Sequence, residues 1–129
     1  MVLLDAEGVS GLIRKDRSTF ALMKGLAQTG ETVAVSAATL VEGVSPSWAP
    51  AAVRWAVSGL EVLDVTRAVA FQATDLLRRS GRHGHRHAMD AIVCATALLA
   101  EEPTTIVTSD PDDIRTLVGD QPQVTVLTV

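Results

Sequence analysis

Residues 104–114 read TTIVTSDPDDI, and this stretch decides the fold. Thr104–Thr108 has the β-branched, mostly apolar character of a short buried strand. It runs directly into an Asp-Pro-Asp-Asp turn that begins at Asp110. Aspartate before proline is a typical helix start, with the aspartate as N-cap and the proline in the first turn. The stretch therefore predicts a strand that leads into a helix through a cluster of acids.

Short apolar runs alternate with longer helical patterns along the rest of the chain. This β-α-β-α alternation predicts a three-layer α/β/α sandwich with a central parallel sheet of four to five strands. The other predicted strands are Val2–Leu4, Thr32–Val35, Glu61–Val65 and Val124–Val129; the predicted helices are Ser18–Gln28, Ala37–Gly43, Ala49–Ser58, Thr66–Arg79 and Ala88–Ala100.

Composition limits the class of protein. The 129 residues suit a single domain over residues 1–129, and 47 % apolar but only 3 % aromatic residues predict a core of Ala, Val, Leu and Ile. No apolar run is long enough to span a bilayer, and the N-terminal segment lacks the basic start of a signal peptide. The single cysteine, Cys94, cannot form an internal disulfide and suits a reducing cytoplasm. A net charge of −4 argues against a protein that coats nucleic acid through positive charge.

Four acids fall at or near the starts of predicted helices, and three of them come after predicted strands. Asp5 follows the first strand, Asp110 follows the strand from Thr104, Glu42 lies on the helix after the second strand, and Asp90 begins the apolar helix. Each acid has a structural alternative, as a helix cap or a solvated helix residue. Asp90 fits such an alternative least well, because its helical neighbours are apolar and buried acids are rarely left unpaired.

Ligands bind to open parallel sheets at the carboxyl ends of the strands, so these acids should meet at one edge. Four carboxylates at one edge need a shared cation, and oxygen ligands suit a hard divalent ion such as Mg²⁺. Two such ions would bring a charge of +4 to a chain of −4, which makes the acidic composition compatible with a polyanionic substrate.

The motifs VLLDAEG, VSAATLVEG, RHAMDAIVCATA and VTSDPDDIRTL, in this order and at this chain length, resemble the PIN-domain ribonucleases. The similarity is greatest to VapC-type toxins and VapC-like proteins, and it covers essentially the whole chain. The DAIVCATA helix and the TSDPDDI turn are its most specific parts.

The resemblance implies a PIN-like sheet in the order 3-2-1-4-5 and hydrolysis of RNA phosphodiester bonds with Mg²⁺ or Mn²⁺. It also implies a cytoplasmic homodimer restrained by a small antitoxin, as in VapBC-type toxin–antitoxin pairs. Asp112 is expected to face solvent. The metal-binding and catalytic acids carry over to Asp5, Glu42, Asp90 and Asp110, with Asp113 as a possible fifth metal ligand.

The chain departs from the family after the first acid, where many relatives carry Ser or Thr and this sequence has Ala6, Glu7 and Gly8. We do not assign Glu7 as a ligand. A hydroxyl near the fourth acid is available from Thr108 or Ser109.

The segment 80–87, SGRHGHRH, is predicted to be an exposed basic loop. Arg82 and Arg86 in this loop, together with Ser109, are candidate RNA contacts. A solvated loop is the simpler alternative. Its three histidines, at positions 83, 85 and 87, are a weaker candidate for a transition-metal site.

Other functions remain open from the sequence. A PIN nuclease could process RNA or DNA without being a toxin, or a PIN-like module could bind a partner without catalysis. A phosphoacceptor signalling module is disfavoured because no lysine follows the last strand. Trp48 and Trp55 are expected in the core, with a partner-binding groove as the alternative.

Overall fold

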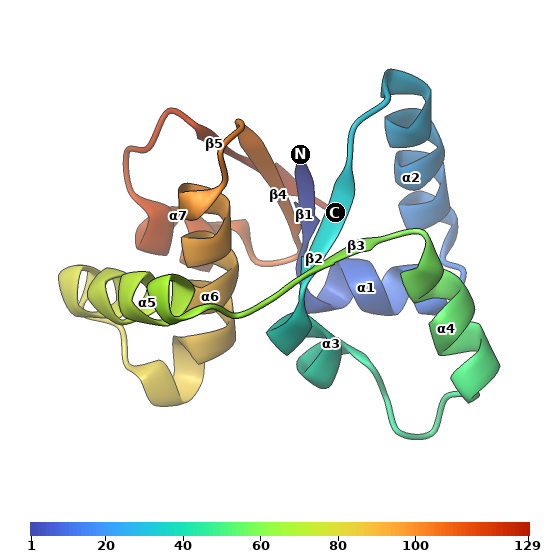
Figure 1. The fold of residues 1–129 in the computed structure, drawn as a ribbon, viewed down its shortest axis with the longest axis horizontal. Helices are drawn as coiled ribbons and strands as arrows, with labels where there is room; N and C mark the ends of the chain where they lie inside the picture. The colour runs from blue at the N-terminus through green and yellow to red at the C-terminus, as the bar shows by residue number, and fades with distance from the viewer.

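A five-stranded parallel sheet forms the centre of the protein (Figure 1). The computed structural model describes residues 1–129. All four strand pairs are parallel, and the order β3-β2-β1-β4-β5 confirms the order expected from the sequence. The strands are β1 (Val2–Leu4), β2 (Val33–Ser36), β3 (Glu61–Leu63), β4 (Thr104–Thr108) and β5 (Val124–Thr128).

Helices cover both faces of the sheet and give the predicted three layers (Figure 1). Helices α1, α2 and α4 pack on one face, and α5, α6 and α7 pack on the other. The longest helix has 16 residues, and none has the length and apolar character needed to cross a membrane. The helices are α1 (Ala6–Ile13), α2 (Arg17–Thr29), α3 (Ala37–Gly43), α4 (Pro50–Ser58), α5 (Arg67–Ser80), α6 (Gly84–Leu99) and α7 (Pro111–Val118).

Two apolar clusters hold these layers together. Successive side chains of a strand point to opposite faces. In β1, Leu3 packs in the cluster below α5, α6 and α7, whereas Val2 and Leu4 pack toward α1 and α4. Both clusters consist mainly of Ala, Val, Leu and Ile, as the low aromatic content predicts. Burial on both faces explains why the central strands are mostly apolar.

The predicted loop at 80–87 is wrong in its second half. His83 is the N-cap of α6 and its Nδ1 accepts a hydrogen bond of 3.1 Å from the backbone N–H of His85. Gly84 begins the helix, although glycine has a low helix propensity. A Cβ atom at this position would lie 3.4 Å from Cδ1 of Leu77 on α5, so packing against α5 favours the helical turn. His87 has non-helical backbone angles, φ −119° and ψ 15°, which kink α6.

A close contact between α1 and α3 positions two of the predicted acids. A Cβ atom at Gly43 would lie 2.9 Å from the carbonyl oxygen of Ala6 and 3.1 Å from its Cα. The Ser10 hydroxyl donates a buried hydrogen bond of 2.7 Å to the carbonyl oxygen of Gly43. Because Ala6 follows Asp5 and Gly43 follows Glu42, this contact sets the separation of the backbone segments that carry both acids.

Replacing Gly43 with alanine should therefore destabilise the protein, by about 1–3 kcal/mol as expected for overpacking against backbone atoms. Chemical denaturation measures the change. Gly25→Ala is the matched control, because nothing lies within 4 Å of a Cβ at this position in α2. The control should gain about 0.5–1 kcal/mol from helix propensity. Equal stabilisation of the two variants would contradict the close contact.

Candidate acidic site

A polar cavity of about 250 Å³ lies at the carboxyl edge of the sheet. Its walls come from the ends of β1 and β4, from α3 and from α6, which are far apart in the sequence. All four acids predicted as catalytic line this cavity. The acids that line it are Asp5, Glu7, Glu42, Asp90 and Asp110.

Asp5 is held by backbone N–H groups from two different segments. Its Oδ1 accepts a hydrogen bond of 2.8 Å from Gly8, and its Oδ2 accepts one of 3.2 Å from Ser109. The first bond makes Asp5 the N-cap of α1, and the second ties the end of β1 to the end of β4. The cap reading of Asp5 is therefore confirmed, and the carboxylate still lines the cavity.

Asp110 likewise caps a helix and borders the cavity. Its carboxylate accepts from the backbone N–H of Asp113 at 3.5 Å, and its own N–H donates to the Thr108 hydroxyl at 3.0 Å. Pro111 occupies the first turn of α7, as predicted. The side chain of Asp112 is 95 % exposed, which confirms that it faces solvent.

The pKa values of two cavity acids show how closely their charges interact. Burial raises the pKa of Asp90, and the neighbouring carboxylates of Asp113, Asp110 and Asp5 raise it further against an opposing effect of His87. Burial also raises the pKa of Glu42, with additional repulsion from Asp90 and Asp5. The folded protein thus holds ionised carboxylates at a cost, which a bound cation would relieve.

Asp113 lies beside this cavity in a second cluster. His87 Nδ1 is 3.7 Å from Asp113 Oδ2 and 3.8 Å from Asp90 Oδ2, while Arg82 Nη1 lies 3.0 Å from Asp113 Oδ1. Only His87, Asp90 and Asp113 bring three ligand atoms within 4.8 Å of one another. From the sequence, His87 was a metal candidate only together with His83 and His85, and the structure does not group these three histidines. The spacing of three residues between His87 and Asp90 on one helix was the available signal for the observed cluster.

The donors of the cavity fit a hard metal ion. They are carboxylate oxygens in a polar cavity, and no three of them converge as tightly as the His87 cluster. Magnesium commonly keeps several waters beside one or two carboxylates, which suits this wider spacing. Asp5 and Asp90 could bind such an ion directly, with Glu42 and Asp110 bound directly or through water.

The remaining predicted residues have different surroundings. Arg82 is paired with Asp113 rather than turned to solvent, whereas Arg86 is exposed and makes no ion pair. Glu7 lines the cavity but pairs with Arg14 at 2.7 Å. Burial and the charge of Asp90 raise the pKa of the Cys94 thiol to about 12, so this cysteine is not a reactive thiolate.

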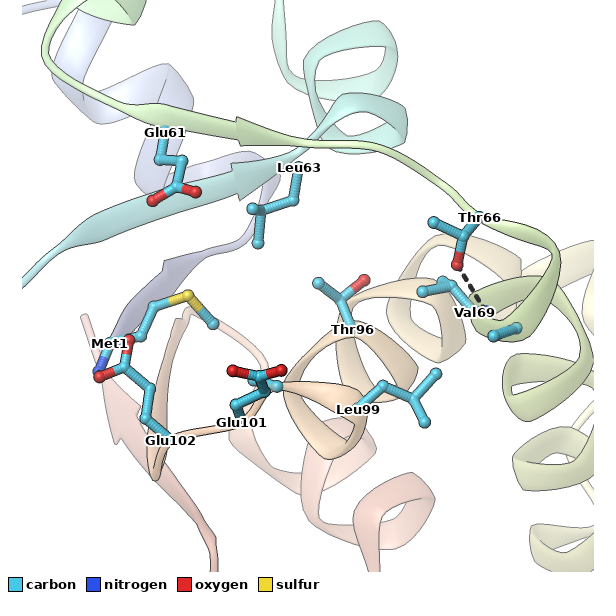
Figure 2. A pocket seen from close by; sticks show the side chains of 11 residues that line it. Met1, Glu61, Leu63, Thr66, Val69, Thr96, Leu99, Glu101 and Glu102 are labelled. Carbon is cyan, nitrogen blue, oxygen red and sulfur yellow. Dashed lines mark hydrogen bonds and ion pairs between the residues drawn. The ribbon is translucent and has the colours of Figure 1, made fainter.

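A larger cavity, of about 930 Å³, lies between β3, the first turn of α5 and the C-terminal end of α6 (Figure 2). Glu61 and Leu63 on β3, Thr96 and Leu99 on α6, and Met1 contribute to its wall. None of the acids predicted as metal ligands lines it. Its acidic groups are exposed and do not converge on one point, so size alone does not make it the candidate site.

Comparison with solved structures identifies the fold. No family model matches the chain, and no curated protein matches its sequence. A chain of the VapBC2 complex from Rickettsia felis, bound to a DNA fragment from their promoter, has a TM-score of 0.67 and 20 % identity over 100 % of this chain and 99 % of that chain. A chain of a toxin–antitoxin complex from Klebsiella pneumoniae has a TM-score of 0.71 and 20 % identity over 97 % and 96 %. At this identity the likeness confirms the expected PIN-like fold.

Asp90→Asn should raise the thermal unfolding midpoint by a few degrees at pH 7 in EDTA, because it removes a charge that the folded state disfavours. The raised pKa means that ionised Asp90 destabilises the fold above this pKa. The gain should therefore shrink as the pH falls and protonation removes the same charge from the parent protein. Asp112→Asn is the control and should give no such increase, since its side chain is exposed. A lower midpoint for Asp90→Asn would contradict the repulsion.

Proposed function

We propose that this protein is a metal-dependent endoribonuclease and the toxin of a VapBC-type toxin–antitoxin pair. The observation that carries this proposal is the meeting of Asp5, Glu42, Asp90 and Asp110 in one polar cavity. These acids come from four separate segments at the carboxyl edge of a PIN-like sheet. Chains of VapBC2 and of the Klebsiella pneumoniae toxin–antitoxin complex share this fold, which supports the toxin assignment.

The proposed reaction is hydrolysis of an RNA phosphodiester bond by water, without a covalent enzyme intermediate. Mg²⁺ or Mn²⁺, when bound, supplies Lewis-acid polarisation of the phosphoryl oxygen and lowers the pKa of water. Asp5 and Asp90 are the proposed direct ligands, and Glu42 and Asp110 complete the site. The backbone N–H groups of Gly8 and Ser109 fix the orientation of Asp5 before the ion binds.

The two arginines that the sequence offered as RNA contacts have different proposed roles. Arg86 is exposed, so its guanidinium is available to a phosphate of the RNA backbone. Arg82 already pairs with Asp113, and we assign it to holding that acid rather than to binding RNA. Ser109 lines the cavity and is a further proposed contact for the substrate.

The proposed partners are a second copy of the chain and a small antitoxin that blocks the site in the cytoplasm. An apolar surface between α2 and α4 supports a protein partner. Trp55 is 54 % exposed, stacks on Phe20 with ring centroids 6.0 Å apart, and lies under Lys15. The core position expected for Trp55 is therefore wrong, whereas Trp48 packs partly buried against the α1 and α4 cluster.

Purified protein should cleave RNA with Mg²⁺ or Mn²⁺ and lose the activity in EDTA. Asp90→Asn should reduce the rate by about 100-fold or more, the scale seen when one charge-stabilising group is removed from a reaction centre. Asp112→Asn should remain near the rate of the parent protein, because this acid faces solvent. Gel analysis of labelled RNA measures the rates. Full activity in EDTA, or an inactive Asp112→Asn beside a normal Asp90→Asn, would refute the assignment.

Expression of the protein alone should slow bacterial growth, and Asp5→Ala should relieve the effect while the protein still accumulates. Co-expression of a small protein encoded next to it should also restore growth. Growth curves with immunoblots separate these causes. Harmless expression of an enzyme that is active in vitro, with a light-scattering mass of one chain, would favour the non-toxin nuclease. A folded protein that binds metal and cleaves no RNA would favour the catalytically silent module.

A further inference from the structure

His87 lies between two carboxylates at a separation that suits a shared ion. Its Nδ1 is 3.7 Å from Asp113 Oδ2 and 3.8 Å from Asp90 Oδ2. These distances are too long for hydrogen bonds. A metal ion about 2.1 Å from each ligand separates pairs of ligands by about 3 to 4.2 Å. Two of the three ligand pairs therefore have separations that suit one divalent ion, and all three ligand atoms lie within 4.8 Å of one another.

The surrounding fold limits other partners for this nitrogen. The side chain of His87 is 11 % exposed, the lowest value of the three residues, and it takes part in no hydrogen bond. His87 and Asp90 are three residues apart on α6, while Asp113 comes from the first turn of α7. A ligand set from two packed helices is held more rigidly than one on a loop.

The two oxygens of Asp113 have separate partners. Arg82 Nη1 lies 3.0 Å from Oδ1, whereas Oδ2 faces His87. The guanidinium therefore neutralises and orients one side of the carboxylate and leaves the other side toward Asp90. Asp90 still has a raised pKa, for which burial and Asp113 are the main causes, so one arginine does not balance the acids.

We propose that His87, Asp90 and Asp113 form a binding site for a divalent transition-metal ion beside the cavity lined by Asp5, Glu42 and Asp110. Imidazole nitrogen favours ions such as Co²⁺, Fe²⁺ or Zn²⁺ over Mg²⁺, whereas an all-carboxylate set suits Mg²⁺. Asp90 borders both groups of ligands. The two positions thus differ in metal preference, and metal binding to the His87 position does not depend on RNA cleavage.

The test uses untagged protein and Co²⁺ at pH 8. Calorimetry measures the affinities for Co²⁺ and Mg²⁺, and proton NMR detects the paramagnetically shifted signals of a cobalt-bound imidazole. His87→Gln should lose these signals and bind Co²⁺ at least about tenfold more weakly, with little change in Mg²⁺ affinity. His85→Gln is the matched control, because His85 is exposed on the same turn and lies outside the cluster. It should behave as the parent protein.

A second variant removes the risk that His87→Gln fails to fold. The chain has three histidines, so the double variant His83→Gln/His85→Gln leaves His87 as the only imidazole. Shifted imidazole signals in this variant would support the site even if the protein cleaves no RNA. Their absence in the double variant, or an unchanged Co²⁺ affinity in folded His87→Gln, would overturn the proposal even if the protein is an active nuclease.

Discussion

Repulsion between carboxylates at one edge of the sheet is the constraint on which the rest of the site depends. Parallel strands in the order 3-2-1-4-5 place β1 between β2 and β4, so Asp5 and Asp110 lie after adjacent strands. Glu42 on α3 and Asp90 on α6 complete the same cavity. Burial and mutual repulsion raise the pKa values of Asp90 and Glu42. The apolar clusters on both faces of the sheet keep these groups together against that cost.

The acids keep their positions because backbone groups and side chains compensate part of their charge. Helix N-termini favour negative charge, and Asp5 and Asp110 each cap a helix at the cavity. Arg82 compensates Asp113, and Arg14 compensates Glu7. A role as helix cap is therefore compatible with a role as metal ligand. A capping carboxylate has two oxygens, whose further lone pairs are available to a metal ion or water.

Local patterns were sufficient to predict the strands and most helix starts, because short apolar runs and capping residues act locally. The strand order was expected from the family resemblance and not from any local pattern. Tertiary packing decided the rest. Glycines at 8 and 11 weaken the helical signal of α1, although the structure places Gly11 against Thr19 and Gly8 against Leu4. In the predicted loop at 80–87, contact with α5 favours the first turn of α6. The pairing of His87 with Asp113 joins residues 26 positions apart, which no local pattern contains.

An acidic chain that binds RNA must provide positive charge locally. The exposed Arg86, which precedes Asp90 by four residues on α6, is the proposed source, while Arg82 is engaged by Asp113. The carboxylates in the cavity would repel a phosphate unless an ion lies between them, because like charges in a partly buried site are poorly screened. Metal binding would therefore determine whether RNA can approach as well as whether it is cut. In this arrangement the same repulsion that raises the pKa values of Asp90 and Glu42 would favour a bound cation.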